Sequence, residues 1–504
     1  MPKAIRPMNS ITRRDFLGGA AGVLAMPWLG LAPAKAQVIP EPTERQRIEA
    51  AIPARAIVPP RKARKLLIFD LNVGYGGHRS ISTCNLAFTL MGEKTGAFQT
   101  VTSREPSIFK PESLSRFDAV FLNNTVGNLF EDPALRQNLV EFVYSGGGLM
   151  GVHGTSVAFT KWPGAIEDWP EFGVMLGARG ANHRANDEHV FIKLDDPTHP
   201  VNQAFGGQGF DYRDEFFRVH KPYSRNRVRV LLSIDTEKTD LQQGPAYGKI
   251  ERADNDYALA WVRQYGRGRV FYCTIAHNPY VFWDAKMLQF YLAAAQFALG
   301  DLPAPTAPSA KLTPAILAQE RFGWRLGLTL PAFGNVTLFE GIDKAAELGL
   351  LYLGASSQQI VSREVTKKFD GQLGNDELRQ VRLRLDEAGV RLLTYSIGPM
   401  PSDEAGRRKV FEFARKMGVE TVIAEPPGDA LDAIEKLPND AGKITSLLEE
   451  TRRRGVRPTM FGVEYIPEKS DSIRGIIQSI DIFNKVSIQL ANAVRHPPAE
   501  RGEQ

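Results

Sequence analysis

Residues 146–156 read Gly-Gly-Gly-Leu-Met-Gly-Val-His-Gly-Thr-Ser. The apolar run from Gly147 to Val152 predicts a buried β-strand, and it leads straight into a glycine turn at His153 and Gly154. A strand that enters so tight a turn before a helix resembles a nucleophile elbow, which presents one side chain at the carboxyl end of the strand. We therefore expect an α/β domain with His153 at that edge of its sheet.

Two further apolar runs precede this strand, at Lys65–Asp70 and Asp118–Asn123. A stretch with helical spacing follows each of them, at Ile81–Met91 and Pro133–Ser145. Continuous apolar strands that alternate with helices are typical of a mostly parallel sheet covered on both faces, and ligands of such sheets bind beyond the carboxyl ends of the strands. Later strands, some of them antiparallel at one edge, are expected at Val190–Leu194, Val228–Ile234, Ala258–Val262 and Arg269–Thr274.

Histidines gather in this part of the chain. Seven of the eight lie within the first 280 residues, and several stand beside turn signals where a scaffold presents its working residues. The sequence Gly74-Tyr75-Gly76-Gly77 precedes His78, and the sequence Asp-Tyr-Arg-Asp-Glu ends in Asp214 and Glu215. This clustering predicts a functional site. The seven are His78, His153, His183, His189, His199, His220 and His277.

Residues 64–300 contain several separate motifs. They are Gly146–Phe159 with Trp169, Leu176–Ala178, Asn182-His183, Thr198–Pro200, Asp214-Glu215 and Tyr265–His277. In these motifs the chain resembles the ThuA-like, or trehalose-utilisation, family, which implies the flavodoxin-type fold of class I glutamine amidotransferases. The resemblance also implies a connection with disaccharides and oxidised (keto) sugars, with no defined reaction. The chain has Ala276-His277 where the family has Gly-His, and residues 182–187 are insertion-like.

Histidine exchanges protons near neutral pH, as sugar chemistry requires. We expect His153 to contact the reacting centre, Glu215 to act as a base or to orient an imidazole, and His277 to act as the complementary acid. His78 joins them as a catalytic candidate. For each of these residues the alternative is a structural role with hydrogen bonds inside the fold. For His199, which lies between two prolines, the structural and the functional role are expected almost equally. The expected substrate-binding residues are Tyr75, Ser156, His183, His199 and Asp214.

Other chemistries fit less well. Glutamine amidotransferases carry a cysteine at the elbow, where this chain has His153, and neither Cys84 nor Cys273 can replace it by position. Nucleophilic catalysis by Ser156 is weak because this residue lies a turn beyond the elbow. No compact metal-ligand motif such as H-E-x-x-H is present, so no residue is designated a metal ligand and no cofactor is expected with confidence. A divalent metal site assembled by the fold stays open.

The proline-rich residues 301–319 predict a linker to a second βα-repeat region over residues 320–492. This region resembles a truncated xylose-isomerase-like (AP-endonuclease-type) TIM barrel, with five expected strands instead of eight and one short helix before a helix at Ala441–Arg454. Of that family's metal ligands only Glu464 has a counterpart, which argues against an active isomerase here. A naturally degenerate barrel and a gene deletion remain alternatives. The five strands are Trp324–Thr329, Leu350–Gly354, Arg391–Tyr395, Thr421–Ala424 and Thr459–Tyr465.

The amino terminus predicts export. Thr12–Leu17 contains a twin-arginine element, an apolar stretch follows, and Ala34-Lys35-Ala36 provides a small-residue cleavage site. We expect a signal peptide over residues 1–36, a periplasmic or secreted mature protein, an extended arm over residues 37–63 and a disordered tail over residues 493–504. The alternative is an uncleaved N-terminal anchor.

The formal charge of the whole chain is +5, but residues 1–36 hold five basic residues and one acidic residue, so the rest is near +1. This balance gives no support for a nucleic-acid partner, and no membrane span is expected in the mature chain. The two cysteines are expected to be buried and unpaired. A small-molecule sugar is the expected partner, and open barrel edges would be covered by the first domain, another protein or a second copy of the chain.

The sequence therefore predicts an exported carbohydrate-metabolism protein with acid–base chemistry in its first domain, an enzyme of unresolved class. The competing hypothesis is a non-catalytic periplasmic sugar-binding or scaffolding protein that carries a degenerate isomerase barrel.

Overall fold

The computed structural model describes residues 42–163, 166–330, 336–424, 434–438, 440–455, 457–465 and 472–495. The predicted signal peptide and most of the predicted tail lie outside these residues. Among the helices described, none is long and apolar enough to cross a membrane.

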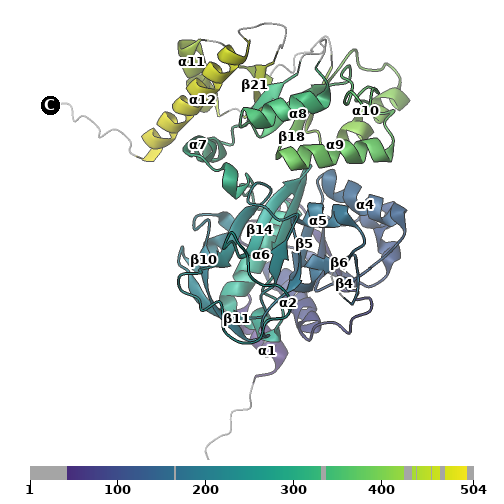
Figure 1. Cartoon of the computed structure of the whole chain (residues 1–504), viewed down its shortest axis with the longest axis vertical. Helices are drawn as coiled ribbons and strands as arrows, with labels where there is room; N and C mark the ends of the chain where they lie inside the picture. The colour runs from purple at the N-terminus through teal and green to yellow at the C-terminus, as the bar shows by residue number, and fades with distance from the viewer. Residues whose placement is uncertain are drawn as a thin grey trace, which may run out of the picture. The chain divides into compact units, whose positions relative to one another are not determined.

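A nine-stranded sheet forms the centre of the first α/β region, in the order β11-β10-β13-β14-β15-β5-β3-β1-β2 (Figure 1). From β15 to β2 all neighbours are parallel, and from β15 to β11 all are antiparallel. The predicted α/β class with an antiparallel edge is confirmed. The strands are β1 (Lys65–Phe69), β2 (Gln99–Ser103), β3 (Ala119–Asn123), β5 (Gly148–Val152), β10 (Glu188–Leu194), β11 (Phe210–Asp214), β13 (Arg229–Ile234), β14 (Ala258–Tyr265) and β15 (Gly268–Cys273).

The direction of the strands decides where a site can form. Strand β15 runs parallel to β5, and three successive strands beyond β15 alternate in direction before β11. Strand β11 therefore points the same way as β1, β5 and β15. Because the carboxyl ends of these four strands lie at the same edge, the segments that follow them can contribute to one site.

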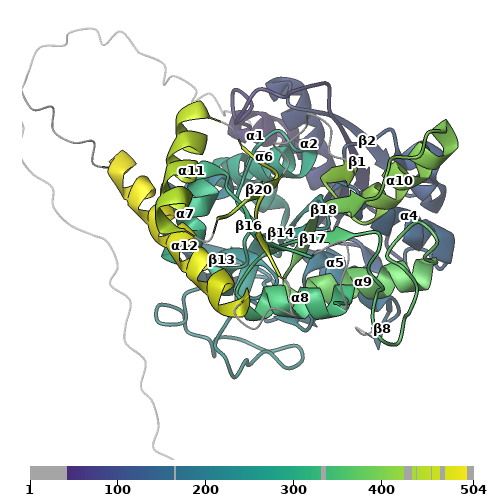
Figure 2. The same ribbon diagram turned by 90° about the horizontal axis from the view of Figure 1, so that it is seen from above.

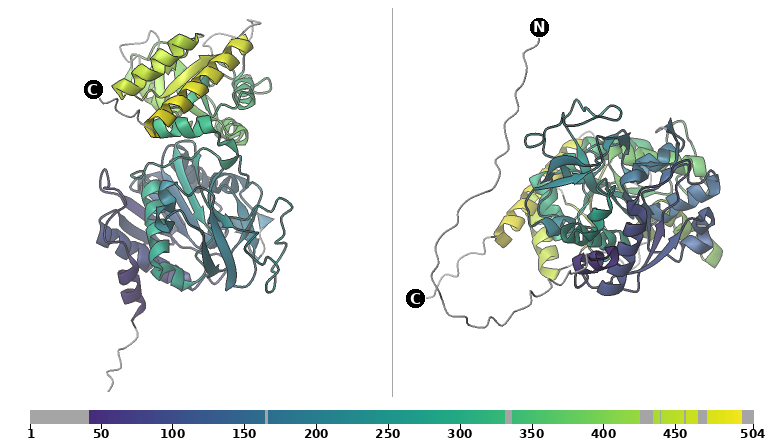
Figure 3. Two further views of the ribbon diagram at one scale, coloured as in Figure 1. Left: turned by 90° about the vertical axis from the view of Figure 1, so that its left-hand side faces the viewer. Right: turned by 90° about the horizontal axis from the view of Figure 1, so that it is seen from below.

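Helices cover both faces of this sheet. One face packs against α1 (Glu44–Ala51), α2 (Ser80–Thr95) and α6 (Ala285–Leu299), with α6 running along the strands (Figure 3). The other face packs against α4 (Pro133–Tyr144) and α5 (Pro170–Leu176). Burial of each large apolar side chain in these two layers stabilises the fold by about 1.5–3 kcal/mol relative to exposure.

Gly148 allows the close approach of α6 to β5. A Cβ atom at this position would lie 2.2 Å from the carbonyl oxygen of Ala298 in α6. Any larger residue would push the helix away from the strand that leads into His153.

The second region is a parallel half-barrel with strand order β19-β18-β17-β16-β21-β20. All five strands expected from the sequence are present. Most of the stretch in which a short helix is expected before Ala441 lies outside the described residues, and its described part contains Ile434–Lys436, which forms β20 and pairs with β21. Three residues carry too little periodicity to reveal a strand without its partner. The other strands are β16 (Leu326–Thr329), β17 (Tyr352–Ser356), β18 (Arg391–Ile397), β19 (Thr421–Ala424) and β21 (Met460–Glu464).

Amphipathic helices pack on this half-barrel through a separate apolar core. Helix α12 lies alongside α7 and α11 (Figure 2). Helix α11 has the bounds expected for it from the sequence. The helices are α7 (Pro314–Phe322), α8 (Leu338–Glu347), α9 (Asn375–Ala388), α10 (Glu404–Lys416), α11 (Ala441–Arg454) and α12 (Ser472–Arg495).

Several segments expected to be irregular are helical. Helix α1 lies within the predicted extended arm, where Thr43 and Gln46 form a capping box. Helix α7 begins at Pro314, inside the predicted linker, and α12 continues to Arg495. Cys84 and Cys273 are buried and unpaired, as predicted.

A buried ion pair joins β10 to β12 (Arg218–His220) next to the segment that holds Glu215. The Arg218 guanidinium donates to both carboxylate oxygens of Glu188 over 2.9 and 2.6 Å, and also to the carbonyl of Phe216. Both side chains are buried, at 2% and 0% exposure. Neither charge could reach water if the other were removed.

We expect Arg218→Met to lower the free energy of unfolding of the first domain by about 3–5 kcal/mol, because it leaves a buried carboxylate without its partner. The double change Arg218→Met, Glu188→Leu should recover much of this loss. Urea unfolding measures both. Arg408→Ala, which breaks the exposed pair with Glu404, is the control and should leave the midpoint unchanged. A loss of equal size in the single and double variants would contradict this account.

His199 is buried and hydrogen-bonded within the first region. It is 1% exposed, and its Nδ1 accepts the N–H of Val201 at the start of the short helix Pro200–Phe205. Its Nε2–H donates to the carbonyl of Pro305 over 3.0 Å. Burial lowers the pKa of His199 from 6.5 to about 4, although the bond to Pro305 and the charge of Asp196 oppose the shift.

This lowered pKa predicts a pH-dependent stability. The unfolded chain binds a proton at His199 below pH 6.5, whereas the folded chain resists protonation down to about pH 4. The stabilisation from neutral His199 is therefore complete above pH 6.5 and declines as the pH falls toward 4, by about 3 kcal/mol. His199→Asn keeps a capping oxygen but does not titrate, so its unfolding free energy should fall less steeply over this interval. Parallel curves for the two proteins would refute the assignment.

Candidate functional site

His153 follows β5 directly and occupies a strained turn. Its φ is 42°, a left-handed value that non-glycine residues adopt rarely and mostly at functional positions. Gly154 donates its N–H to Asn124, and Thr155 donates its hydroxyl to the carbonyl of Leu122 in β3. These bonds fix the turn against the neighbouring strand, as the predicted elbow requires.

The ring of His153 is fixed as well. Its Nδ1–H donates to the carbonyl of Thr274 over 2.8 Å, and the ring packs on Phe217 with centroids 4.1 Å apart. Since Nδ1 carries the proton of the neutral ring, Nε2 carries a lone pair. The side chain is fully buried, and Nε2 has no hydrogen-bond partner within the described structure.

His277 stands on the loop that follows β15. Asp214, the last residue of β11, accepts the backbone N–H groups of His277 and Asn278 over 3.1 and 3.0 Å, and the Asn278 amide over 2.7 Å. The carbonyl of Ala276 accepts bonds from Ser80 and Asn124. Asp214 is fully buried, so it positions His277 and does not face solvent.

Glu215, next to Asp214, is the point on which the imidazoles converge. Its Oε1 lies 3.3 Å from Nε2 of His153. Its Oε2 lies 3.2 Å from Nδ1 of His183 and 3.7 Å from Nε2 of His277. One carboxylate therefore meets three histidines from three different segments of the chain.

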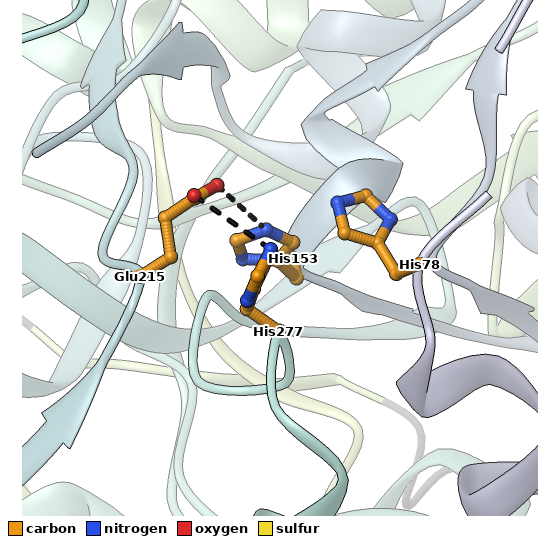
Figure 4. A group of neighbouring side chains, drawn as sticks. All are labelled: His78, His153, Glu215 and His277. Atoms are coloured by element: carbon orange, nitrogen blue, oxygen red, sulfur yellow. Dashed lines mark ion pairs between the residues drawn. The ribbon is translucent and has the colours of Figure 1, made fainter. Parts of the chain in front are cut away.

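His78 completes the group from the loop after β1. Its ring lies 4.8 Å from that of His153 and 5.2 Å from that of His277, centroid to centroid. Figure 4 shows Glu215 and His78 approaching the His153 and His277 rings from opposite sides. We call His78, His153, Glu215 and His277 the His/Glu cluster. Each member offers one potential ligand atom, and these atoms all lie within 4.8 Å of one another.

The surroundings of His78 and His277 favour the neutral form of these two rings, because their pKa values are lowered. Burial, with smaller contributions from the neighbouring histidines, lowers the pKa of His78 from 6.5 to about 2. Burial also lowers the pKa of His277. For Glu215, burial raises the pKa, but the contact with His153 and the positive charges that His153, His183 and His277 carry when protonated outweigh it, and the net shift of the pKa is downward.

Polar and aromatic side chains surround the open side of the cluster. His277 and His183 are 21% and 24% exposed in their side chains, whereas His153 is fully buried. Tyr75 packs on His78 and on Trp162, and burial together with the charge of Glu215 raises its pKa. His183 stacks on Tyr247 with centroids 5.1 Å apart. A ligand that enters beside His277 would meet these rings.

The remaining predicted residues lie differently. Ser156 is 1% exposed, and its hydroxyl donates to the carbonyl of Gly180 over 2.8 Å. The side chain therefore stabilises the turn after β5 from inside the fold. Both ring nitrogens of His199 are engaged within the fold. His189 pairs with Asp211 at the surface, and His220 contacts Asn182. Neither contacts the cluster in the described structure.

Sequence reasoning missed the residues that orient the cluster. Thr274 uses its carbonyl for His153 and its hydroxyl for the N–H of Phe217. Asn124, with a φ of 53°, holds both the elbow and the loop of Ala276. Asn124 could have been recognised in the sequence, because it directly follows an apolar strand. The carbonyl of Thr274 could not, because every residue has a backbone carbonyl.

Comparisons with known proteins bear on this first region. Residues 65–298 match the family model described as "ThuA: Trehalose utilisation". The comparison with curated proteins gives no match.

Several solved structures are similar to part of this chain at low identity and low TM-score. A putative ThuA-like protein from Bacteroides uniformis is 18% identical, with 47% of this chain and 92% of that chain covered and a TM-score of 0.38. One from Parabacteroides merdae is 19% identical, with 48% and 92% covered and a TM-score of 0.35. A β-galactosidase from a Rahnella species is 14% identical, with 48% and 32% covered and a TM-score of 0.30.

The family match contains every residue of the His/Glu cluster and both strands that converge on His153 and His277. Residues 65–298 are therefore a ThuA family domain.

Proposed function

We propose that this chain is an exported enzyme of carbohydrate metabolism, and that its ThuA domain acts on a disaccharide or a keto-sugar by acid–base chemistry at the His/Glu cluster. The observation that carries the proposal is the convergence of His153, His277 and His183 on the single carboxylate of Glu215. Groups that exchange protons at neutral pH, held within contact of each other, are what general acid–base catalysis needs.

The geometry suggests a division of roles. A proton can be shared between His153 Nε2 and Glu215 Oε1, so this pair can act as a proton donor or acceptor. Because both side chains are held in place by the fold, they need to move little when the proton is transferred. His277 is partly exposed and has a lowered pKa, which favours proton acceptance over the acid role expected from the sequence. A sugar hydroxyl or a C–H beside a ketone supplies the proton that moves.

Aromatic rings support a sugar as the ligand. Tyr75, Trp162 and Tyr247 flank the open side of the cluster, and flat rings beside polar groups suit the apolar faces and hydroxyls of a pyranose. The same rings fit the alternative, a non-catalytic sugar-binding protein, because binding alone needs no proton transfer. Turnover separates the two.

His153→Asn is the sharpest variant for this test. Asparagine tolerates the positive φ at position 153, so the turn can persist without the imidazole. We expect turnover to fall by about 10²–10⁴-fold with substrate binding changed by less than about tenfold. Trehalose, sucrose and their 3-keto forms are the substrates, with products followed by mass spectrometry. The matched control is His189→Asn, at a surface histidine paired with Asp211.

Unchanged turnover in His153→Asn would refute the proposed site. Absence of turnover for every sugar, with binding retained by the native protein, would support the sugar-binding alternative. His189→Asn should behave like the native protein in both measurements.

A further inference from the structure

We propose that the His/Glu cluster is a divalent transition-metal site, in which His78, His153, His277 and Glu215 hold an ion of the class of Zn²⁺. The inference adds a cofactor to the proposed function and rests on that function only for the role of the ion, because binding can be measured without any sugar. With an ion bound, His153, His277 and Glu215 are its ligands, and their proton-exchange roles apply to the metal-free cluster.

The lone pair of His153 is the first argument. Its Nδ1–H is committed to the carbonyl of Thr274, so Nε2 of the neutral ring presents a lone pair. That lone pair lies 3.3 Å from Oε1 of the Glu215 carboxylate. Two electron-rich atoms at this distance repel each other unless a cation lies between them. The cation is either a proton or a metal ion.

The number of converging groups favours a metal ion. Nε2 of His153 is buried and has no hydrogen-bond partner in the described structure, and a buried polar atom left unpaired costs about 1–3 kcal/mol. A proton shared by His153 and Glu215 would satisfy that pair but would not account for the approach of His78 and His277. A metal ion can engage all four residues together, because one potential ligand atom of each lies within 4.8 Å of the others.

The donor types agree with ligation. Metal ions bind imidazole nitrogen and carboxylate oxygen, and the cluster supplies both kinds of atom within 4.8 Å of one another. The proposal stands on this convergence of four side chains.

Outer contacts complete the arrangement. A metal-binding histidine normally donates its other N–H to a carbonyl or carboxylate, as His153 does to Thr274. His183 has its Nδ1–H between the carbonyl of Arg184 and Oε2 of Glu215, at 2.6 and 3.2 Å. His183 therefore orients the carboxylate rather than joining the ligands.

The donor set selects the class of ion. Three imidazoles and one carboxylate suit Zn²⁺ and its first-row neighbours, whereas Mg²⁺ and Ca²⁺ prefer oxygen ligands. Donor atoms of a tetrahedral zinc site lie about 3.4 Å apart, given bonds of about 2.1 Å. The four ligand atoms here lie within 4.8 Å of one another, so small side-chain rotations bring them to an ion. The partly exposed side at His277 leaves room for a sugar oxygen, which the ion would polarise.

Metal binding should be measured directly on the tag-free mature protein. After dialysis against chelator and its removal, ZnCl₂ is titrated by calorimetry, and bound zinc is counted by elemental analysis after gel filtration. Addition of Co²⁺ gives an independent readout, since a four-coordinate site absorbs strongly in the visible range. We expect one ion per chain, and affinity at least about 100-fold weaker in His153→Asn and His277→Asn.

The zinc titration needs two controls. His189→Asn alters an exposed histidine and should keep native affinity and stoichiometry. Thermal unfolding without metal shows whether each ligand variant is folded, and only folded variants are compared.

Binding of zinc by the native protein, with loss in both ligand variants but not in His189→Asn, would establish the site. No bound zinc or cobalt in the native protein, or equal binding in the native protein and both ligand variants, would overturn the inference. Zinc binding without turnover of any sugar would leave the metal site standing and refute the proposed function. Turnover that persists in the metal-free protein, together with no binding of zinc or cobalt, would support the proposed function and overturn the metal site.

Discussion

The site depends on one electrostatic constraint, the approach of imidazole nitrogens to the buried carboxylate of Glu215. His153, His183 and His277 reach it from three separate segments at distances of 3.2–3.7 Å. Such a contact holds only if a proton or a metal ion compensates the carboxylate and if the backbone of each segment is fixed. Asp214 fixes the loop of His277, and Thr274 fixes the ring of His153. The sheet supplies four strand ends at one edge on which this can occur.

Much of this fold could be predicted from the sequence. Continuous apolar runs identified β1, β3 and β5, and the change to a glycine turn placed His153 at a strand end. The bounds of α11 agree with the helix expected at Ala441–Arg454. These features succeed because periodicity and turn chemistry are local. The histidines at 78 and 277 were recognised for the same reason, as each stands just beyond a strand.

The contacts that turn these residues into a site were not predictable. Glu215 meets His153 only because β11 points in the same direction as β5 across four intervening strands, which is a property of the sheet order. The buried position of Asp214 and the internal bonds of Ser156 and His199 depend on packing between distant segments. Strand β20 needs β21 as its partner. Single residues in a sequence carry no record of such neighbours.

The central claim is that Glu215 takes part in a reaction on sugars. Its most direct test is the steady-state rate and the substrate affinity of Glu215→Gln, which keeps the shape of the side chain but removes its charge. The account predicts that turnover of the sugar substrate falls by at least about 100-fold while the dissociation constant changes by less than about tenfold. Native turnover in a folded Glu215→Gln protein would contradict the account.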